Sequence, residues 1–187
     1  MYRLQQFAMA PHNKLAAWLA DAGISQAEMA RRCGYDRSNF HRLLEVLTST
    51  PQPPAELRAQ LEAELGLTAA EFAPLWEQAQ RVVSAPGLAR FFEPGRHLRA
   101  ANEVAYCARS GDIFRIDRLI EFENEVWVLD YKTGARAEID DCRIEEYRTQ
   151  VACYLEAVKE AFPRHEVRGA IVFADATTLE VGIAPVC

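Results

Sequence analysis

The apolar positions along the chain follow two different periods. Up to residue 85 they recur every three or four positions, as on one face of a helix, whereas from Glu103 onward they largely alternate with polar positions, as in strands. This change of period predicts a helical region followed by a layered α/β domain.

Three short helices are predicted between residues 13 and 47, with breaks at Gly23 and Gly34. Ser25 and Glu28 have the spacing of a capping box, and Asp36 can cap the helix that follows it. Each short helix therefore has its own start signal.

A proline-rich stretch over residues 48–54 separates these helices from the rest of the chain. Two more helices are expected beyond it, over residues 55–65 and 69–85, and glycines follow both. We therefore expect a helical region over residues 1–47 and a second unit over residues 48–187 that begins with its own helices.

Four segments in the second half have the alternation of strands: NEVAYCA, IFRIDRLIEF, EVWVLDYK and VRGAIVFADA. Between the last two, residues 147–162 have a helical period. The order of three strands, a helix and a strand predicts a mixed sheet flanked by helices, an α/β fold.

The second and third of these strands carry ionisable groups that a hairpin would bring together. Asp130 and Lys132 are two positions apart, so they share a face of the sheet. If Glu123 and Asn124 form a two-residue turn, residues whose numbers add up to 247 are opposed, and Asp117 faces Asp130. Opposed Cβ atoms lie roughly 4.5 to 5.5 Å apart, so the carboxylates repel unless a positive charge lies between them. A divalent cation bound between the two carboxylates would offset that repulsion.

A second group of polar side chains lies on the predicted helix. Tyr147, Gln150 and Tyr154 have the spacing i, i+3 and i+7, so they share a face that could lie over the carboxylate-bearing strands. Taken singly, the tyrosines are also typical of a core and the glutamine of a surface, and the charged strand residues could form ordinary ion pairs.

Composition limits the classes of function. The net charge of −6 argues against tight nonspecific binding of nucleic acid, although it leaves room for a local basic groove. Five cysteines without paired spacing indicate reduced thiols rather than disulfides or a zinc site. No apolar run approaches the roughly 20 residues of a membrane span, and we expect a cytoplasmic protein that makes no contact with membranes.

The segment GISQAEMARRCGYDRSNFHRLL resembles the helix-turn-helix of Cro and repressor-like regulators. The resemblance implies that RSNFHRLL enters the major groove of DNA, with Arg37, Ser38, Asn39 and Arg42 as base or phosphate contacts. The alternative is a helical hairpin that packs on the rest of the protein.

Three motifs of the second half, RID at residues 115–117, DYKTG at 130–134 and YRTQVACY at 147–154, together resemble the nuclease domain at the C-terminus of RecB and AddA-type helicases, a branch of the PD-(D/E)XK nucleases. The resemblance implies an exonuclease-like deoxyribonuclease that uses Mg²⁺ or Mn²⁺ in DNA repair or recombination. The chain has no phosphate-binding P-loop motif, so it is not an ATP-driven helicase by itself. It would be either a free-standing nuclease or a nuclease that works with a helicase or other repair protein as its partner.

The same resemblance implies roles for individual residues. Asp117 and Asp130 would bind the metal, and Lys132 would lie beside the attacked phosphate. The helical motif that supports the site and touches DNA comprises Tyr147, Gln150 and Tyr154.

The segment HRLLEVLT resembles the part of the family that holds a metal-binding histidine, which makes His41 a candidate ligand and Glu103 a further acidic contributor. A half-buried helix histidine is the alternative for His41. For the whole protein, the alternative is a helix-turn-helix regulator in which the nuclease-like fold is a scaffold.

Overall fold

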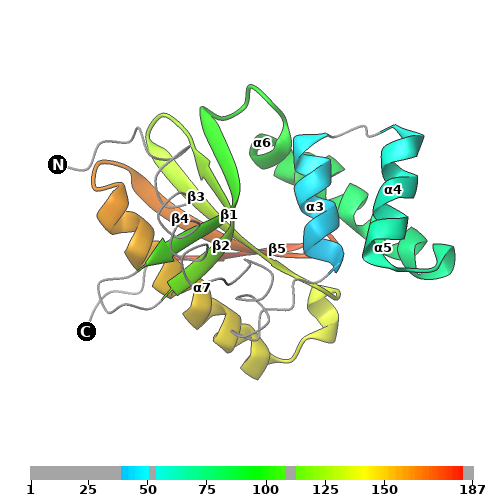
Figure 1. Ribbon diagram of the computed structural model, residues 1–187. Helices are drawn as coiled ribbons and strands as arrows, with labels where there is room; N and C mark the ends of the chain where they lie inside the picture. Colours follow the sequence, from blue (N-terminus) through cyan, green and yellow to red (C-terminus); the bar gives the residue numbers. More distant parts are fainter. Residues whose placement is uncertain (1–38, 51–53, 108–112, 183–187) are drawn as a thin grey trace, which may run out of the picture.

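The structure is a computed structural model, and it describes residues 39–50, 54–107 and 113–182 (Figure 1). Helices come first and a sheet with one long helix follows, in the order α3 (Asn39–Ser49), α4 (Ala55–Leu65), α5 (Ala69–Ser84), α6 (Ala89–Phe92), β1 (Arg99–Cys107), β2 (Ile113–Glu121), β3 (Glu125–Lys132), α7 (Asp141–Ala161), β4 (Glu166–Phe173) and β5 (Thr178–Val181). Short 3₁₀ turns lie at Pro86–Leu88 and Arg136–Glu138. In the described ranges, no helix has the length and apolar character that a bilayer crossing requires.

The five strands form one mixed sheet in the order β1-β2-β3-β4-β5. Only β3 and β4 pair in parallel, and α7 makes the crossover between them, as a parallel pair requires. The other neighbours pair antiparallel. The expected α/β fold, a mixed sheet flanked by helices, is confirmed.

Helices cover both faces of this sheet (Figure 1). Along β3, Trp127, Leu129 and Tyr131 pack with the helical layer of α3, α5 and α6, whereas Val126 and Val128 pack with α7. Because both faces are covered, β3 is buried along almost its whole length. Any polar side chain of this strand therefore lies in the interior.

The helices of the first layer follow the sequence closely. The predicted range 55–65 is that of α4, which ends at Gly66 with a φ of 64°. The helix α5 begins with a capping box between Thr68 and Glu71 and ends one residue before the expected position. Its range is therefore correct to within a residue.

The helix α3 runs two residues beyond the expected end, because Thr48 and Ser49 hydrogen-bond through their hydroxyls to the Glu45 carbonyl and prolong the last turn. The helices predicted before residue 39 lie outside the described residues.

Two expectations about the second half are wrong. The helix expected from Tyr147 starts six residues earlier at Asp141, because the Asp140 side chain accepts a hydrogen bond from Arg143 N and caps it. The acidic run 138–141 therefore includes the helix start. The short strand β5 was not expected, since its four residues are too few to show an alternation.

The hairpin of β2 and β3 has the predicted register. Arg118 pairs with Leu129 and Leu119 with Val128, so paired residue numbers add up to 247, with a bend at residues 123–124. The pairing of β2 with β3 stops at Arg118 and Leu129, while β3 stays paired with β4 as far as Lys132. The two strands thus part and form a fork.

The strand β2 also turns over at the fork. Its pairing with β1 continues on both sides of Glu103 and Asp117 but skips these two residues, and Glu103 has a φ of 56°. Ile120 packs with the helical layer and Ile116 with α7, although residues four apart on a regular strand share a face. This distortion sets the direction in which Asp117 points.

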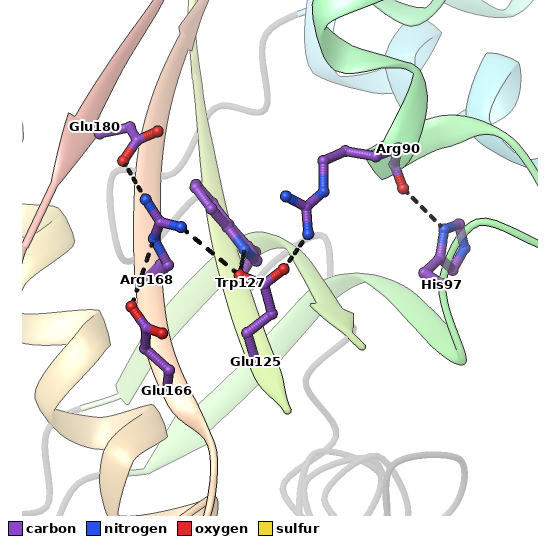
Figure 2. A network of polar contacts seen from close by, with 7 residues as sticks. All are labelled: Arg90, His97, Glu125, Trp127, Glu166, Arg168 and Glu180. Atoms are coloured by element: carbon purple, nitrogen blue, oxygen red, sulfur yellow. Dashed lines mark hydrogen bonds and ion pairs between the residues drawn. The ribbon is translucent and has the colours of Figure 1, made fainter. Parts of the chain in front are cut away.

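A network of ion pairs and aromatic rings lies near the start of β3, away from the fork (Figure 2). Glu125 pairs with Arg90 and with Arg168, and Trp127 Nε1 donates to Glu125 Oε2 at 2.8 Å. Both guanidinium groups lie within 6 Å of the Trp127 ring centroid. Through Arg90 on α6, the network ties the helical layer to the sheet.

Candidate active site

Two side chains take the place of the ladder bonds that are missing where β2 and β3 part. Tyr131 N donates to Asp117 Oδ2 at 2.7 Å, and the Tyr131 carbonyl accepts from His41 Nε2 at 2.8 Å. Buried backbone polar groups need partners, and here the two side chains supply them. The parting of the strands therefore fixes the positions of Asp117 and His41.

His41 comes from the helical layer. Four side chains anchor α3 in the core, Phe40, Leu43, Leu44 and Leu47, and His41 projects from this helix toward the fork. Its Nε2 lies 3.5 Å from Asp117 Oδ2. The helix thus brings an imidazole to a carboxylate of the sheet.

Asp130 and Lys132 lie on the sheet face that α7 covers, as their spacing predicts. Lys132 Nζ lies 2.8 Å from Asp130 Oδ2 and donates to Gln150 Oε1 at 2.9 Å. The ammonium also lies 4.3 Å from the centroid of the Tyr147 ring. The sheet and α7 together hold the ammonium in place.

A second hydrogen bond, between two side chains of α7, orients the Gln150 amide that contacts this ammonium. Gln150 Nε2 donates to the hydroxyl of Tyr154 at 2.6 Å, so the amide oxygen is turned toward Lys132. Tyr154 is buried, with 1% of its surface exposed. The helix face predicted from the sequence does lie over the carboxylate-bearing strands.

The ionised forms of the two carboxyl groups are disfavoured, so both pKa values are raised. Burial first, and then the charge of Asp130, raise the pKa of Asp117 to about 7, against the opposing effects of His41 and the Tyr131 amide. Burial also raises the pKa of Asp130, although Lys132 and His41 oppose it. The interior thus holds two acidic groups with less positive charge than they require.

Glu103, the further acidic candidate, faces Asp117 across the β1–β2 pair. Its carboxylate forms an ion pair with Arg115, and its negative charge contributes to the raised pKa of Asp117. Arg115 was not singled out from the sequence, although it begins the RID motif. Its position beside the fork depends on the distorted pairing, which leaves no trace in the sequence.

The proposed helix-turn-helix contacts are described only in part. Arg37 and Ser38 lie outside the described residues, Asn39 begins α3 half-buried, and Arg42 is exposed on the same helix. The apolar side of this helix packs against α5.

The donor set of the fork can be compared with what a metal ion needs. Among the described residues, no three His, Cys, Asp or Glu side chains are arranged to enclose an ion. A carbonyl only accepts, so His41 Nε2 carries a proton as placed and cannot also bind a metal. Asp117 and Asp130 nevertheless fit Mg²⁺, which proteins bind through one or two carboxylates completed by water and substrate phosphate. Their mutual repulsion is the charge that such an ion would neutralise.

Comparison with known proteins places the chain in a class. Residues 16–182 match the family model of the PD-(D/E)XK nuclease superfamily, which covers most of the chain. The chain therefore belongs to the PD-(D/E)XK nuclease superfamily. Members of this superfamily are typically nucleases and usually use divalent metals.

Among solved structures, the crystal structure of SSO0001 is similar to this chain, with 17% identity and a TM-score of 0.33. The similarity covers 80% of this chain and 77% of that chain. No curated protein sequence matches the chain.

Proposed function

We propose that the protein is a divalent-metal-dependent deoxyribonuclease that hydrolyses the phosphodiester bonds of DNA at the fork between β2 and β3. One observation carries the proposal: two buried carboxyl groups, Asp117 and Asp130, repel each other, and Asp130 contacts the Lys132 ammonium. Three neighbouring side chains, those of Asp130, Gln150 and Tyr147, hold this ammonium in place. Perturbed acids beside a fixed cation are typical of catalytic sites.

Asp117 and Asp130 would hold Mg²⁺ or Mn²⁺. When bound, such an ion lowers the pKa of a water molecule and offsets charge on the phosphoryl oxygens. Lys132 has a separate role, since a preorganised ammonium stabilises the additional negative charge of the attacked phosphate. Gln150 and Tyr154 fix the direction of that ammonium, and Tyr147 shields it from one side.

His41 would serve the same centre in one of two ways. It would bind the metal after its ring releases the Tyr131 carbonyl, or it would position Asp117 and Tyr131 in the present arrangement. The first role is the one that the family resemblance implies.

We further propose that the DNA strand runs over the fork and contacts Tyr147 and the outer side of α3, where Asn39 and Arg42 would meet its backbone. Arg37, which lies outside the described residues, remains a proposed DNA contact. The resemblance to RecB and AddA favours an exonuclease-like activity in DNA repair or recombination, together with a helicase or other repair partner. A cytoplasmic location fits this role.

Cleavage of labelled linear DNA tests the proposal. Purified protein should degrade single-stranded or duplex DNA with Mg²⁺ or Mn²⁺ and not with EDTA. Lys132→Ala should lower the rate at least about a hundredfold, since one preorganised donor to a transition state contributes on the order of 10² to 10³.

Lys159→Ala is the matched control, because Lys159 is an exposed lysine on α7 that donates to the His165 carbonyl, and this variant should cleave DNA normally. A Lys132→Ala variant with wild-type activity would contradict the proposed site. Sequence-specific retention of DNA without cleavage would instead favour the helix-turn-helix regulator.

A further inference from the structure

A pocket of about 540 Å³ lies on the helical side of the sheet, beside the fork. Its walls come from the C-terminal half of α3, the segment between α6 and β1, and the strands β1 and β2. The lining includes Thr48, Ser49, Phe92, Leu98, Asn102 and Arg118.

Arg118 gives this pocket a buried positive charge. The side chain is in the interior, with 4% of the residue exposed. Its Nε and Nη2 donate to the Phe91 carbonyl at 3.1 and 2.9 Å, and Nη1 donates to Asn102 Oδ1 at 2.7 Å. Both acceptors, the Phe91 carbonyl and the Asn102 amide oxygen, are uncharged.

A guanidinium has five N–H groups, and these bonds use three of them. A buried charge without an opposite partner is costly, and an anion in the pocket would remove that cost.

The remaining walls suit the rest of a nucleotide rather than a bare anion. The Arg118 guanidinium lies over the Phe92 ring, 5.3 Å from its centroid, and the Asn102 amide donates to the Thr48 hydroxyl at 2.8 Å. Leu98 lines the pocket with 66% of its surface exposed, and no other large apolar side chain among the described residues is so exposed. Rings, hydroxyls and an exposed aliphatic group are the surfaces on which a sugar and a base rest.

The charges of the pocket define an orientation. Glu45 and the C-terminal end of α3 place negative charge at one wall. Arg99, which also lines the pocket, is already paired with Glu121. A phosphate therefore belongs at the Arg118 end, and the sugar and base belong toward α3.

The position of the pocket matches the path of a strand that leaves the fork. Arg118 directly follows Asp117, and Thr48 lies seven residues beyond His41 on α3, about 10 Å along the helix axis. That length corresponds to about three nucleotides at roughly 3.4 Å of rise each.

We propose that this pocket binds a nucleotide of the DNA strand within about three nucleotides of the cleaved bond, with its phosphate on the remaining N–H groups of Arg118. The inference rests on the proposed nuclease function and adds to it a subsite that holds the strand in register.

Binding in EDTA tests the subsite without cleavage. The probes are deoxythymidine monophosphate and inorganic phosphate, followed by calorimetry, and a fluorescein-labelled single-stranded oligonucleotide, followed by anisotropy. Ser49→Glu places a carboxylate at the rim of the pocket, where Ser49 is exposed, and should weaken the mononucleotide and the oligonucleotide about tenfold through like-charge repulsion.

Gln80→Glu is the matched control, because it adds the same charge at an exposed position of α5 and should change neither affinity by more than about twofold. Arg118→Met should abolish mononucleotide binding, and a melting curve shows whether this buried variant folds. Ser49→Glu keeps the test decisive if Arg118→Met does not fold.

Three results would overturn the subsite: no binding of the mononucleotide, equal weakening by Ser49→Glu and Gln80→Glu, or inorganic phosphate that binds as tightly as the mononucleotide. DNA cleavage by wild-type protein together with any of these would leave the nuclease proposal intact. The wild-type protein could instead bind the mononucleotide, lose this binding in Ser49→Glu and not cleave DNA. That result would support the subsite and contradict the nuclease proposal.

Discussion

Asp117 combines a structural contact with its proposed role as a metal ligand. It accepts the Tyr131 amide, lies beside His41 and is repelled by Asp130. The ionised form of Asp117 is unfavourable without a metal ion, because it is buried next to another negative charge. A bound cation would offset this repulsion. The fold thus holds Asp117 in a place that an ion would improve.

The raised pKa of Asp117 predicts how the stability of the metal-free protein depends on pH. The folded form binds its proton up to about pH 7, whereas the unfolded form releases it near 4. Between these values the folded state binds more protons, so this group lowers the free energy of unfolding as pH rises, by at most about 1.4 kcal/mol per unit.

Asp117→Asn removes the titration and keeps an acceptor for Tyr131 N. Melting curves in EDTA should therefore show that the variant gains stability over the wild type between pH 5 and pH 8. Mg²⁺ should stabilise the wild type more at pH 8 than at pH 5. An identical pH dependence in both proteins would contradict the assigned pKa.

The role of His41 can be separated into ligation and positioning. His41→Gln can still donate to the Tyr131 carbonyl through its amide, whereas His41→Ala cannot. If His41 binds the metal, both variants should lose about tenfold or more in Mn²⁺ affinity measured by calorimetry. If it positions the fork, the glutamine variant should retain wild-type affinity and the alanine variant should lose it.

At the scale of elements, α7 is placed over the sheet by a close approach at β4. A Cβ atom on Gly169 would lie 2.8 Å from Val151 Cγ1 and 2.9 Å from Leu155 Cδ2. These residues share α7 with Gln150 and Tyr154, so the absence of a side chain at Gly169 fixes the depth at which the helix reaches Lys132.

Gly169→Ala should lower the free energy of unfolding by about 1 to 3 kcal/mol, since overpacking of a tight interior has this cost. DNA cleavage should fall as well, because α7 must move away from Lys132. Gly87→Ala is the control, as a Cβ there meets nothing within 4 Å. Chemical denaturation measures both variants, and equal stabilities would show that the helix has room to shift.

The sequence was sufficient for the hairpin and insufficient for the fork. A two-residue bend and the alternation of apolar residues determine the β2–β3 register, and both are local. The parting of the strands depends on a distorted pairing at Glu103 and on a histidine from α3, which meet only in three dimensions. The start of α7 at Asp141 was missed because a capping aspartate in an acidic run resembles a loop.

The residues of the proposed site were nevertheless visible in the sequence. The motif spacing singled out Asp130, Lys132 and Gln150, which the structure brings into contact. Arg118 was not singled out, because an arginine beside an aspartate is typical of an ordinary ion pair. Its burial, and the pocket in front of it, arise from the packing of β2 against α6.

At the scale of the whole molecule, the network around Glu125 joins the two parts that form the site (Figure 2). Burial would raise the pKa of Glu125, but hydrogen bonds from Trp127 and Arg90 and the charges of Arg90 and Arg168 outweigh it and lower the pKa. A carboxyl group with a lowered pKa stabilises the fold above its unfolded pKa, and this stabilisation is lost as pH falls through the folded value.

Glu125→Gln should therefore destabilise the protein at pH 7 by about 1 to 2 kcal/mol, as expected for a partly buried charged hydrogen bond. The difference from wild type should shrink as the pH falls below the unfolded pKa of a glutamate, about 4.3, and through the lower pKa of folded Glu125. Glu166→Gln is the control, because Glu166 is exposed and its contact with Arg168 is 3.9 Å long. Urea unfolding at several pH values checks both variants, and a difference that is constant with pH would contradict the argument.

The hydrogen bond from Tyr131 N to Asp117 gives the fork its own reporter. An ion that draws Asp117 toward itself would weaken that bond. The NMR chemical shift of the Tyr131 backbone amide should therefore change when metal binds. The same amide would exchange faster with solvent in proteins that lack the carboxyl group. Because Asp117 and His41 hydrogen-bond to the backbone of Tyr131, backbone NMR signals can report metal binding at the site without substrate.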